Sequence, residues 1–302
     1  MEIYLVNVAA ANRDEFVRVC ESEYCERLER AAVRIRASGA RIIMLTGPSA
    51  SGKTTSAHKL AATMVADGTP AKVISLDNFF RGAENYPLLP DGTRDYESPA
   101  TLDMPEINRC LSQLNDSGET DLPIYDFKAE RRAAQRQHIS LEGGVCFVEG
   151  IHALNPQLTR LLPPEGVFRI YAGLREEYSS DGRRVINTQD IRLCRRILRD
   201  AAGRGHSTEK TLSMWNHVLD GENKYIKIYK ETANFILDTS FTYEMNVIAG
   251  LAGTALAATP QDSPYYPLMR DTAAHFAELK PLPAECVPAA SMLQEFYGKD
   301  AG

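Results

Sequence analysis

The hydrophobic and polar positions follow two periods along the chain, and their alternation predicts an α/β fold. Five short apolar runs have the length of buried strands: Arg41–Thr46, Lys72–Leu76, Val145–Val148, Val167–Ala172 and Asn234–Leu237. Elsewhere apolar residues recur every three or four positions, which predicts helices over Asp14–Ala37, Lys53–Ala66, Met104–Asn115, Thr188–Ala202, Thr208–Asp220 and Tyr243–Ala257. Strands that alternate with helices indicate a parallel sheet that is covered on both faces.

Two polar segments interrupt this rhythm. Arg81–Asp103 is a long loop rich in proline, and a loop of that length inside a compact domain is usually functional. Leu122–Leu141 is extended at both ends with a charged middle, which predicts a hairpin or flap. We therefore expect a helical arm over residues 1–38, a main domain over 39–250, and a C-terminal helical extension over 251–302 that packs on the main domain.

Composition narrows the class of protein. Of the 302 residues, 44% are apolar and 25% are charged, with a formal net charge of -6, so general binding to nucleic acid is not expected. No apolar run approaches the ~20 residues of a membrane span, and we see no signal peptide. The six cysteines form no C-x-x-C pair, which favours reduced thiols in a cytoplasmic protein. Assembly into a homo-oligomer is left open.

One motif carries specific chemistry. Residues 47–54 read GPSASGKT, the phosphate-binding pattern G-x-x-x-x-G-K-[ST], directly after an apolar strand and at the start of a helix. A chance match in a Gly- and Ser-rich loop would not need that context. Lys53 would contact the β- and γ-phosphates of ATP, the Thr54 hydroxyl would ligate Mg²⁺, and Thr55 could add a phosphate contact. The predicted phosphate cradle is Gly47, Pro48, Ser49, Ala50, Ser51, Gly52, Lys53, Thr54 and Thr55.

Two carboxylates follow predicted strands at the same edge of the sheet. Glu149 comes at the tip of the third apolar run, where a P-loop enzyme places its second magnesium contact. Asp77 follows the second run, and we expect it to point into the crevice beside the P-loop as a general base for an acceptor hydroxyl. The alternatives are an acid in solvent for Glu149 and a turn cap for Asp77.

A row of arginines lies on one face of the predicted helix 188–202. The members fall at i, i+3, i+4 and i+7: Arg192, Arg195, Arg196 and Arg199. Asp190 and Asp200 offer opposite charge only at the ends of the row, whereas a polyphosphate would neutralise all of it. Arg204, between two glycines, could move with a lid. The alternative is a solvated basic face. The absence of an N-K-x-D signature argues against a GTPase.

Several blocks together resemble the uridine kinase branch of the phosphoribulokinase/uridine kinase family. They are GPSASGKTT, SLDNFF, DYESPATLD, LPIYDFKAERR, VEGIHALNP, DIRLCRRILRDAAGRGHSTEKTLSMW, GENKYI and VPAASMLQEF, in family order from about residue 40 to the end. The likeness is greatest to bacterial uridine kinase-like proteins that often carry an N-terminal domain related to threonyl-tRNA synthetase, which this sequence lacks. It implies a three-layer P-loop kinase fold with a five-stranded parallel sheet, a hairpin over the nucleoside and an arginine-bearing lid.

The resemblance also implies roles for single residues. Asp77 would act as base at the ribose 5′-hydroxyl, and Glu97 would stand where family members commonly use Asp to hold the ribose hydroxyls. Two aromatic residues, Tyr125 and Phe127, would line the base pocket. Arg192 and Arg195 would contact substrate and phosphates, and Arg196 and Arg204 would bind the donor.

At the pyrimidine-contacting position, where characterised uridine kinases carry His, this chain has Glu130. The alternative is that Glu130 pairs with Arg131, Arg132 or Arg136 on a solvated hairpin. We expect an Mg-ATP-dependent kinase of uridine or cytidine. The alternatives are a kinase of another small alcohol, such as another nucleoside, a sugar phosphate or pantothenate, and a regulatory nucleotide-binding module without turnover.

Overall fold

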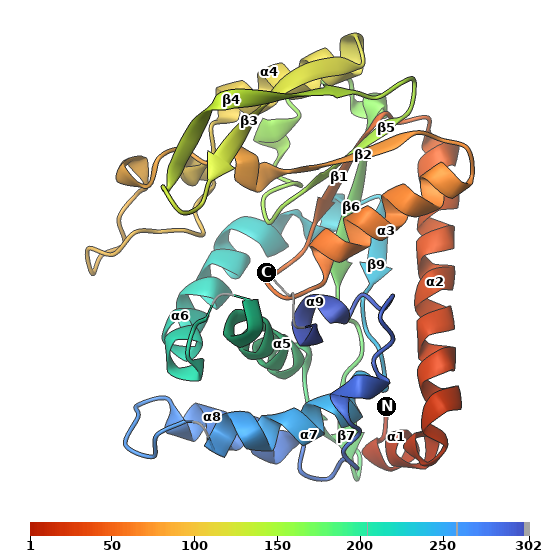
Figure 1. The fold of residues 1–302 in the computed structure, drawn as a ribbon, viewed down its shortest axis with the longest axis vertical. Coiled ribbons are helices and arrows are strands. Elements are labelled where there is room, and N and C mark those ends of the chain that lie inside the picture. Colours follow the sequence, from red (N-terminus) through yellow and green to blue (C-terminus); the bar gives the residue numbers. More distant parts are fainter. Residues whose placement is uncertain (204, 258, 299–302) are drawn as a thin grey trace.

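A five-stranded parallel sheet forms the centre of the molecule, as the sequence predicts (Figure 1). The computed structural model describes residues 1–203, 205–257 and 259–298. The strands follow the order β2-β5-β1-β6-β9, with bounds β1 Ile42–Thr46, β2 Ala71–Ser75, β5 Val145–Glu149, β6 Val167–Gly173 and β9 Phe235–Asp238. Every residue of β1 and β5 is buried, since helices cover both faces of the sheet.

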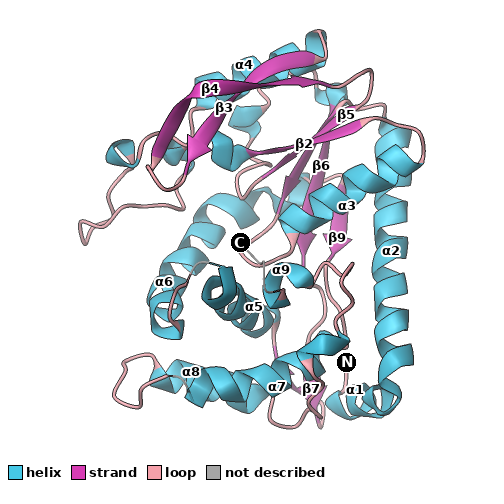
Figure 2. Ribbon diagram, in the orientation of Figure 1, coloured by secondary structure: helices cyan, strands magenta, loops and turns pink. Residues whose placement is uncertain are grey.

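Helices pack on both faces of this sheet (Figure 2). On one face, α2 Arg13–Ser38 and α3 Lys53–Ala66 contribute Tyr24, Leu28 and Leu60 to a core that they share with Phe147 and Ile170 of the sheet. On the other face, α4 Met104–Asp116 contributes Ile107 and Leu111 to a second core that also contains Ile42 and Met44 of β1. The three-layer α/β/α fold that the sequence predicts is therefore confirmed.

The carboxyl ends of the strands point toward a second group of helices (Figure 1). This group contains α5 Thr188–Gly203, α6 Thr208–Gly221, α7 Glu244–Ala257, α8 Tyr266–His275 and α9 Gln294–Tyr297. Phe296 of α9 is fully buried in the same core as α2, so the two ends of the chain share one hydrophobic cluster. The predicted boundaries at residues 38 and 250 stay a prediction.

The predicted hairpin is present as β3 Glu119–Asp126 and β4 Arg131–Ser140, which pair antiparallel. The loop over residues 81–103 contains only short 3₁₀ turns at Ala83–Asn85 and Pro99–Thr101. Two elements were not predicted, a first helix α1 Ile3–Ala9 and a small hairpin of β7 Tyr178–Ser180 and β8 Arg183–Ile186. The small hairpin turns through an Asp-Gly pair with φ of 51° and 73°, a local signal that could have revealed it.

Two further expectations concern the whole chain. Among the described residues, none of the helices combines the length and the apolar character needed to cross a membrane. All six cysteines lie in the described part of the chain, and each is a free thiol.

Candidate active site

The P-loop connects the end of β1 to the start of α3, and its glycines are sterically required. A Cβ on Gly47 would lie 2.2 Å from the carbonyl oxygen of Ala172 in β6. Gly52 has a φ of +78°, and a Cβ there would lie 2.4 Å from the Sδ of Met292. The loop is thus pressed between the sheet and the C-terminal segment, which fixes the path of the backbone whose N–H groups would meet phosphate.

Thr54, in the first turn of α3, lies beside Glu149 at the carboxyl end of β5. The strand register pairs Leu45 with Glu149, and the Thr54 hydroxyl donates a 3.1 Å hydrogen bond to the Glu149 carboxylate. These hard oxygen ligands suit Mg²⁺. Within the described residues, no group of three or more His, Cys, Asp or Glu could hold a metal ion, so the ion would also need phosphate and water oxygens. That donor set fits a magnesium bound together with a nucleotide.

Two arginines of α5 reach the P-loop at Ser49. Arg192 donates to the Ser49 carbonyl oxygen at 3.2 Å and forms a two-pronged ion pair with Glu222, whose side chain is fully buried. Glu222 in turn accepts a 3.2 Å bond from the Ser49 backbone N–H. Arg196 donates to the Ser49 hydroxyl at 2.7 Å. The face of α5 that carries these arginines therefore packs directly on the phosphate loop.

Arg195 is held differently, because its side chain is completely buried. Its guanidinium forms two 2.7 Å bonds to Glu244 and also donates to the carbonyl oxygens of Thr239 at 3.0 Å and Ala50 at 3.4 Å. The ring centroid of Phe296 lies 4.8 Å from it. Four of its five N–H groups thereby have protein partners. Through its bond to the Ala50 carbonyl oxygen, Arg195 helps to hold the P-loop in position.

The expectation that only Asp190 and Asp200 offer opposite charge to the arginine row is wrong. Glu222 and Glu244 are paired with Arg192 and Arg195, although they lie 30 and 49 residues away in sequence. Such long-range partners leave no trace in the helical spacing, so the sequence could not show them. The predicted donor contact Arg204 lies outside the described residues.

The C-terminal segment also touches a residue predicted to bind phosphate. Glu295 of α9 accepts bonds from the Thr55 hydroxyl at 2.7 Å and from the Thr55 backbone N–H at 3.3 Å. A carboxylate is stabilised at a helix N-terminus for the same reason as a phosphate. The sequence analysis missed Glu295, since no local pattern connects residue 295 to the P-loop.

Asp77 lies in the 3₁₀ turn Leu76–Phe79 that follows β2, and its side chain is exposed. The turn is capped by Ser75, whose hydroxyl accepts the Asp77 N–H, so the cap is not Asp77. Burial, followed by Tyr125, Tyr96 and the charge of Asp77, raises the pKa of Tyr86 well above its ordinary value. The Asp77 carboxylate is therefore close enough to Tyr86 to affect the pKa of that phenol.

The aromatic pair predicted for the base pocket belongs to a larger cluster. Tyr125 and Phe127 lie with ring centroids 5.2 Å apart, and Tyr125 is 5.7 Å from Phe80. Tyr86 continues the chain of rings, 6.2 Å from Phe80 and 5.5 Å from Tyr96. Phe127 is 62% exposed and Tyr125 only 8%, so the cluster has a buried base and an open rim. The loop over residues 81–103 supplies two rings that the sequence analysis did not single out.

Glu97 is partly buried against α6, where a Cβ on Gly221 would lie 2.4 Å from the Glu97 Cβ. Burial raises its pKa to about 7; the charges of Arg196 and Lys53 oppose this, and that of Glu222 adds to it. Arg196 and Glu222 both contact Ser49, so Glu97 lies near the P-loop. Near pH 7 the carboxyl group can therefore exchange a proton, unlike an ordinary surface glutamate.

Glu130 is exposed at the turn of the main hairpin, in a left-handed conformation with a φ of 49°. Two of its suggested partners are paired elsewhere, since Arg132 binds Asp103 at 2.9 Å and Arg136 binds Glu106. Its contact with a nucleoside base stays a prediction.

Comparison with known proteins agrees with a P-loop kinase site. A model of the Phosphoribulokinase / Uridine kinase family matches residues 42–245. A uridine kinase of Lactobacillus johnsonii is 28% identical over 195 residues, 62% of this chain and 84% of that protein. A uridine kinase of Deinococcus deserti is 29% identical over 174 residues, 58% of this chain and 75% of that protein.

A solved structure shares the fold. It is described as a possible uridine kinase from Bacillus stearothermophilus, with a TM-score of 0.50 and 17% identity over 72% of this chain and 100% of that one. Together with a family match over more than half of the residues, the P-loop architecture leads to one conclusion. The chain belongs to the phosphoribulokinase/uridine kinase family, and it is an ATP-dependent phosphotransferase with a P-loop kinase fold.

Proposed function

We propose that the protein transfers the γ-phosphoryl group of Mg-ATP to the 5′-hydroxyl of a pyrimidine nucleoside, uridine or cytidine. The observation that carries this proposal is the exposed Asp77 carboxylate, which directly follows β2 and lies near Tyr86, a member of the same aromatic cluster as Tyr125 and Phe127. Such an arrangement offers a base for a hydroxyl proton and flat apolar faces for a planar ring. Relatives named as uridine kinases support the same acceptor class.

On the donor side, the N–H groups of the loop and Lys53 bind the phosphates. Thr54 and Glu149 hold Mg²⁺, which when bound would offset negative charge on the phosphate oxygens. Arg192 and Arg196, both in contact with Ser49, are the arginines best placed to meet the transferring group. Arg195 keeps these elements in position through Glu244, and we assign any effect of Arg195 on the rate to that support.

On the acceptor side, Asp77 takes the proton of the 5′-hydroxyl as the phosphoryl group moves. Glu97 accepts bonds from the ribose hydroxyls, and these bonds are strongest when its carboxyl group is ionised. Tyr125 and Phe127 stack on the base, and Glu130 accepts from its N–H or amino group.

The second candidate is a kinase of the same fold for a different small alcohol. It is favoured by Glu97 and Glu130, which differ from the residue types that uridine kinases use at these positions. A regulatory module that only binds nucleotide is disfavoured by Asp77, since such a module has no need of an exposed carboxylate at this edge.

ADP release measured with Mg-ATP and a panel of acceptors tests the proposal. The panel contains uridine, cytidine, purine nucleosides, sugar phosphates and pantothenate. We expect release that depends on a pyrimidine nucleoside and is lost in Lys53→Ala, because removal of one contact to transition-state charge costs roughly 10²–10³-fold in kcat. Release with another alcohol alone would support the second candidate, and no release across the panel would support the regulatory module.

A further inference from the structure

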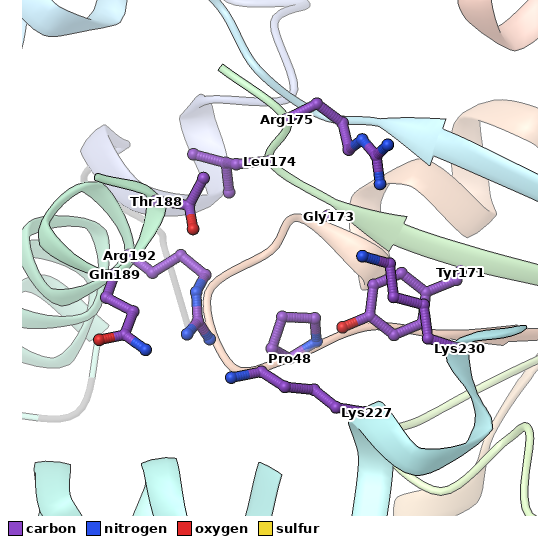
Figure 3. Close-up of a pocket in the computed structure, with 10 residues that line it drawn as sticks. All are labelled: Pro48, Tyr171, Gly173, Leu174, Arg175, Thr188, Gln189, Arg192, Lys227 and Lys230. Carbon is purple, nitrogen blue, oxygen red and sulfur yellow. The ribbon is translucent and has the colours of Figure 1, made fainter. Parts of the chain in front are cut away.

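A cavity lined by cationic side chains lies beside the P-loop, at the carboxyl end of β6 (Figure 3). Its volume is about 180 Å³. Its walls come from the P-loop, the end of β6, the start of α5 and the 3₁₀ helix Lys227–Thr232. The residues that line it are Pro48, Tyr171, Gly173, Leu174, Arg175, Thr188, Gln189, Arg192, Lys227 and Lys230.

Positive charge dominates this cavity. Four of the lining residues are cations, and none is a carboxylate. Glu222, the nearest carboxylate to two of them, is fully buried, paired with Arg192 and 3.9 Å from Lys227. In the described part of the chain, neither Arg175 nor Lys230 has a carboxylate within 4.0 Å. Arg175 and Lys230 therefore offer an anion positive charge that no carboxylate neutralises, whereas Glu222 already pairs with Arg192 and lies near Lys227.

Neutral groups complete the lining. Burial raises the pKa of Tyr171 to about 12, against the opposing charge of Arg192, so its hydroxyl stays protonated at neutral pH and can donate. The Lys230 ammonium lies 5.6 Å from the centroid of the Tyr171 ring, which holds it at the cavity wall. Thr188 and Gln189 add a hydroxyl and an amide from the first turn of α5. In Figure 3 the side chains of Arg192, Lys227 and Tyr171 surround Pro48.

The cavity is separate from the phosphate cradle. It shares only Pro48 and Arg192 with the residues assigned to the donor and acceptor, and Asp77, Lys53 and Glu149 do not line it. Its volume is also below the ~300–1,000 Å³ that is usual for larger organic ligands. These two facts favour a small anion that binds next to, rather than within, the P-loop.

We propose that this cavity binds a phosphate group that does not belong to the donor nucleotide. The ligand class is a small phosphate monoester, whose dianionic oxygens would be bound by Lys227, Lys230 and Arg175 at the rim and by Arg192 at the base. Because Arg192 also contacts Ser49, an occupant of the cavity is coupled to the loop that holds the donor phosphates. The phosphate could belong to a phosphorylated acceptor or to an effector, and the kinetic measurement below separates the two.

Calorimetry with inorganic phosphate as the probe tests the site. In the double variant Lys227→Gln/Lys230→Gln we expect affinity to fall at least tenfold, since each lost partner removes a charge-assisted contact. The matched control is Lys224→Gln in the preceding π-helical turn Glu222–Ile226, because Lys224 lies over the Tyr225 ring and not in the cavity. If the double variant is not stably folded, the single variant Arg175→Gln at the rim provides an independent test, and we expect it to lower phosphate affinity as well. Equal phosphate affinity in wild type and both cavity variants would overturn the proposal.

A second titration uses a saturating non-hydrolysable ATP analogue with Mg²⁺. We expect phosphate affinity to change by no more than a few-fold, whereas complete competition would assign the cavity to the donor and overturn the proposal. In the kinase reaction, competition of phosphate with the acceptor identifies an acceptor subsite, and a change in kcat without competition identifies an effector site. Both titrations need no acceptor, so their failure leaves the proposed kinase activity standing, and failure of the acceptor panel leaves the anion site standing.

Discussion

The donor side and the acceptor side of the candidate site are built in opposite ways. The P-loop is surrounded by buried partners, with Arg195 and Glu244 fully enclosed and Glu222 fixed between Ser49 and Arg192. The acceptor side consists of a loop and a hairpin tip, where Phe127 is 62% exposed and Tyr96 48% exposed. One side is held by long-range ion pairs, while the other presents rings and carboxylates at a surface.

This difference indicates which residues can be substituted without loss of stability. A buried ion pair that loses one partner leaves an uncompensated charge, so we expect substitution of Arg192, Arg195 or their carboxylate partners to destabilise the fold. Exposed side chains contribute little to stability, so those on the acceptor side can change without unfolding the protein. We therefore expect substitutions on the donor side to affect folding and phosphoryl transfer, and substitutions at the exposed rim to affect the choice of acceptor.

The largest expected effect is on stability at the buried pair. Arg195→Met should lower the free energy of unfolding by about 3–5 kcal/mol, because Glu244 would keep a buried charge without its partner. Urea denaturation measures this. The control is Arg270→Met, whose pair with Asp271 is exposed and should change stability by less than about 1 kcal/mol. Equal losses in the two variants would show that burial does not make the Arg195–Glu244 pair more important for stability than an exposed ion pair.

The next effect is on catalysis without stability. Asp77→Asn keeps the size of the side chain but removes the base, so kcat should fall roughly 10²-fold or more while the acceptor KM changes little. Steady-state kinetics and a thermal melt are the measurements. Asp91→Asn, at an exposed position of the loop over residues 81–103, is the control and should keep wild-type kcat. An unchanged kcat in the Asp77 variant would move the base to another residue.

Glu97 connects the two sides, and its effect depends on pH. Its pKa rises from 4.5 to about 7 on folding, so the folded state holds a proton that the unfolded state loses. The stability that this group contributes is therefore present below about pH 4.5 and is lost as pH rises through about 7. Glu97→Gln does not ionise, so its stability relative to wild type should increase by about 1–2 kcal/mol between pH 4 and pH 8, less than the full shift would give, since the side chain is partly exposed.

Chemical denaturation at the two pH values measures the effect. Glu119→Gln, on the exposed edge of β3, is the control and should show no such change. A difference between Glu97→Gln and wild type that is the same at both pH values would mean that Glu97 titrates as an ordinary surface carboxyl.

The smallest effect concerns acceptor preference. An ionised carboxylate accepts hydrogen bonds and is repelled by the two carbonyl oxygens of uracil, so cytidine should be at least as good an acceptor as uridine. Glu130→His should shift the ratio of kcat/KM toward uridine by about tenfold, with unchanged stability because the residue is exposed. Glu142→His, another exposed glutamate with positive φ, is the control. A ratio that Glu130→His leaves unchanged would place Glu130 outside the base pocket.

The sequence by itself determined the local architecture. The five strands and the helix after the P-loop are where periodicity predicts them, and the predicted bounds of α3, Lys53–Ala66, agree with the structure at both ends. These features depend on neighbours a few positions apart, on alternation of apolar residues, and on glycines such as Gly47 and Gly52. The P-loop can be identified from the sequence for the same reason, because its phosphate-binding residues lie within eight consecutive positions.

Which charges form ion pairs depends on the packing of distant segments. Spacing along α5 showed a row of arginines but not that Glu222 and Glu244 would neutralise Arg192 and Arg195. The contact of Glu295 with Thr55, 240 residues apart, was likewise invisible. Ion pairs between distant elements depend on how the chain packs, and packing depends on all the buried side chains together rather than on any short pattern. The same holds for the cationic cavity, whose lysines and arginines come from separate segments that only the fold brings together.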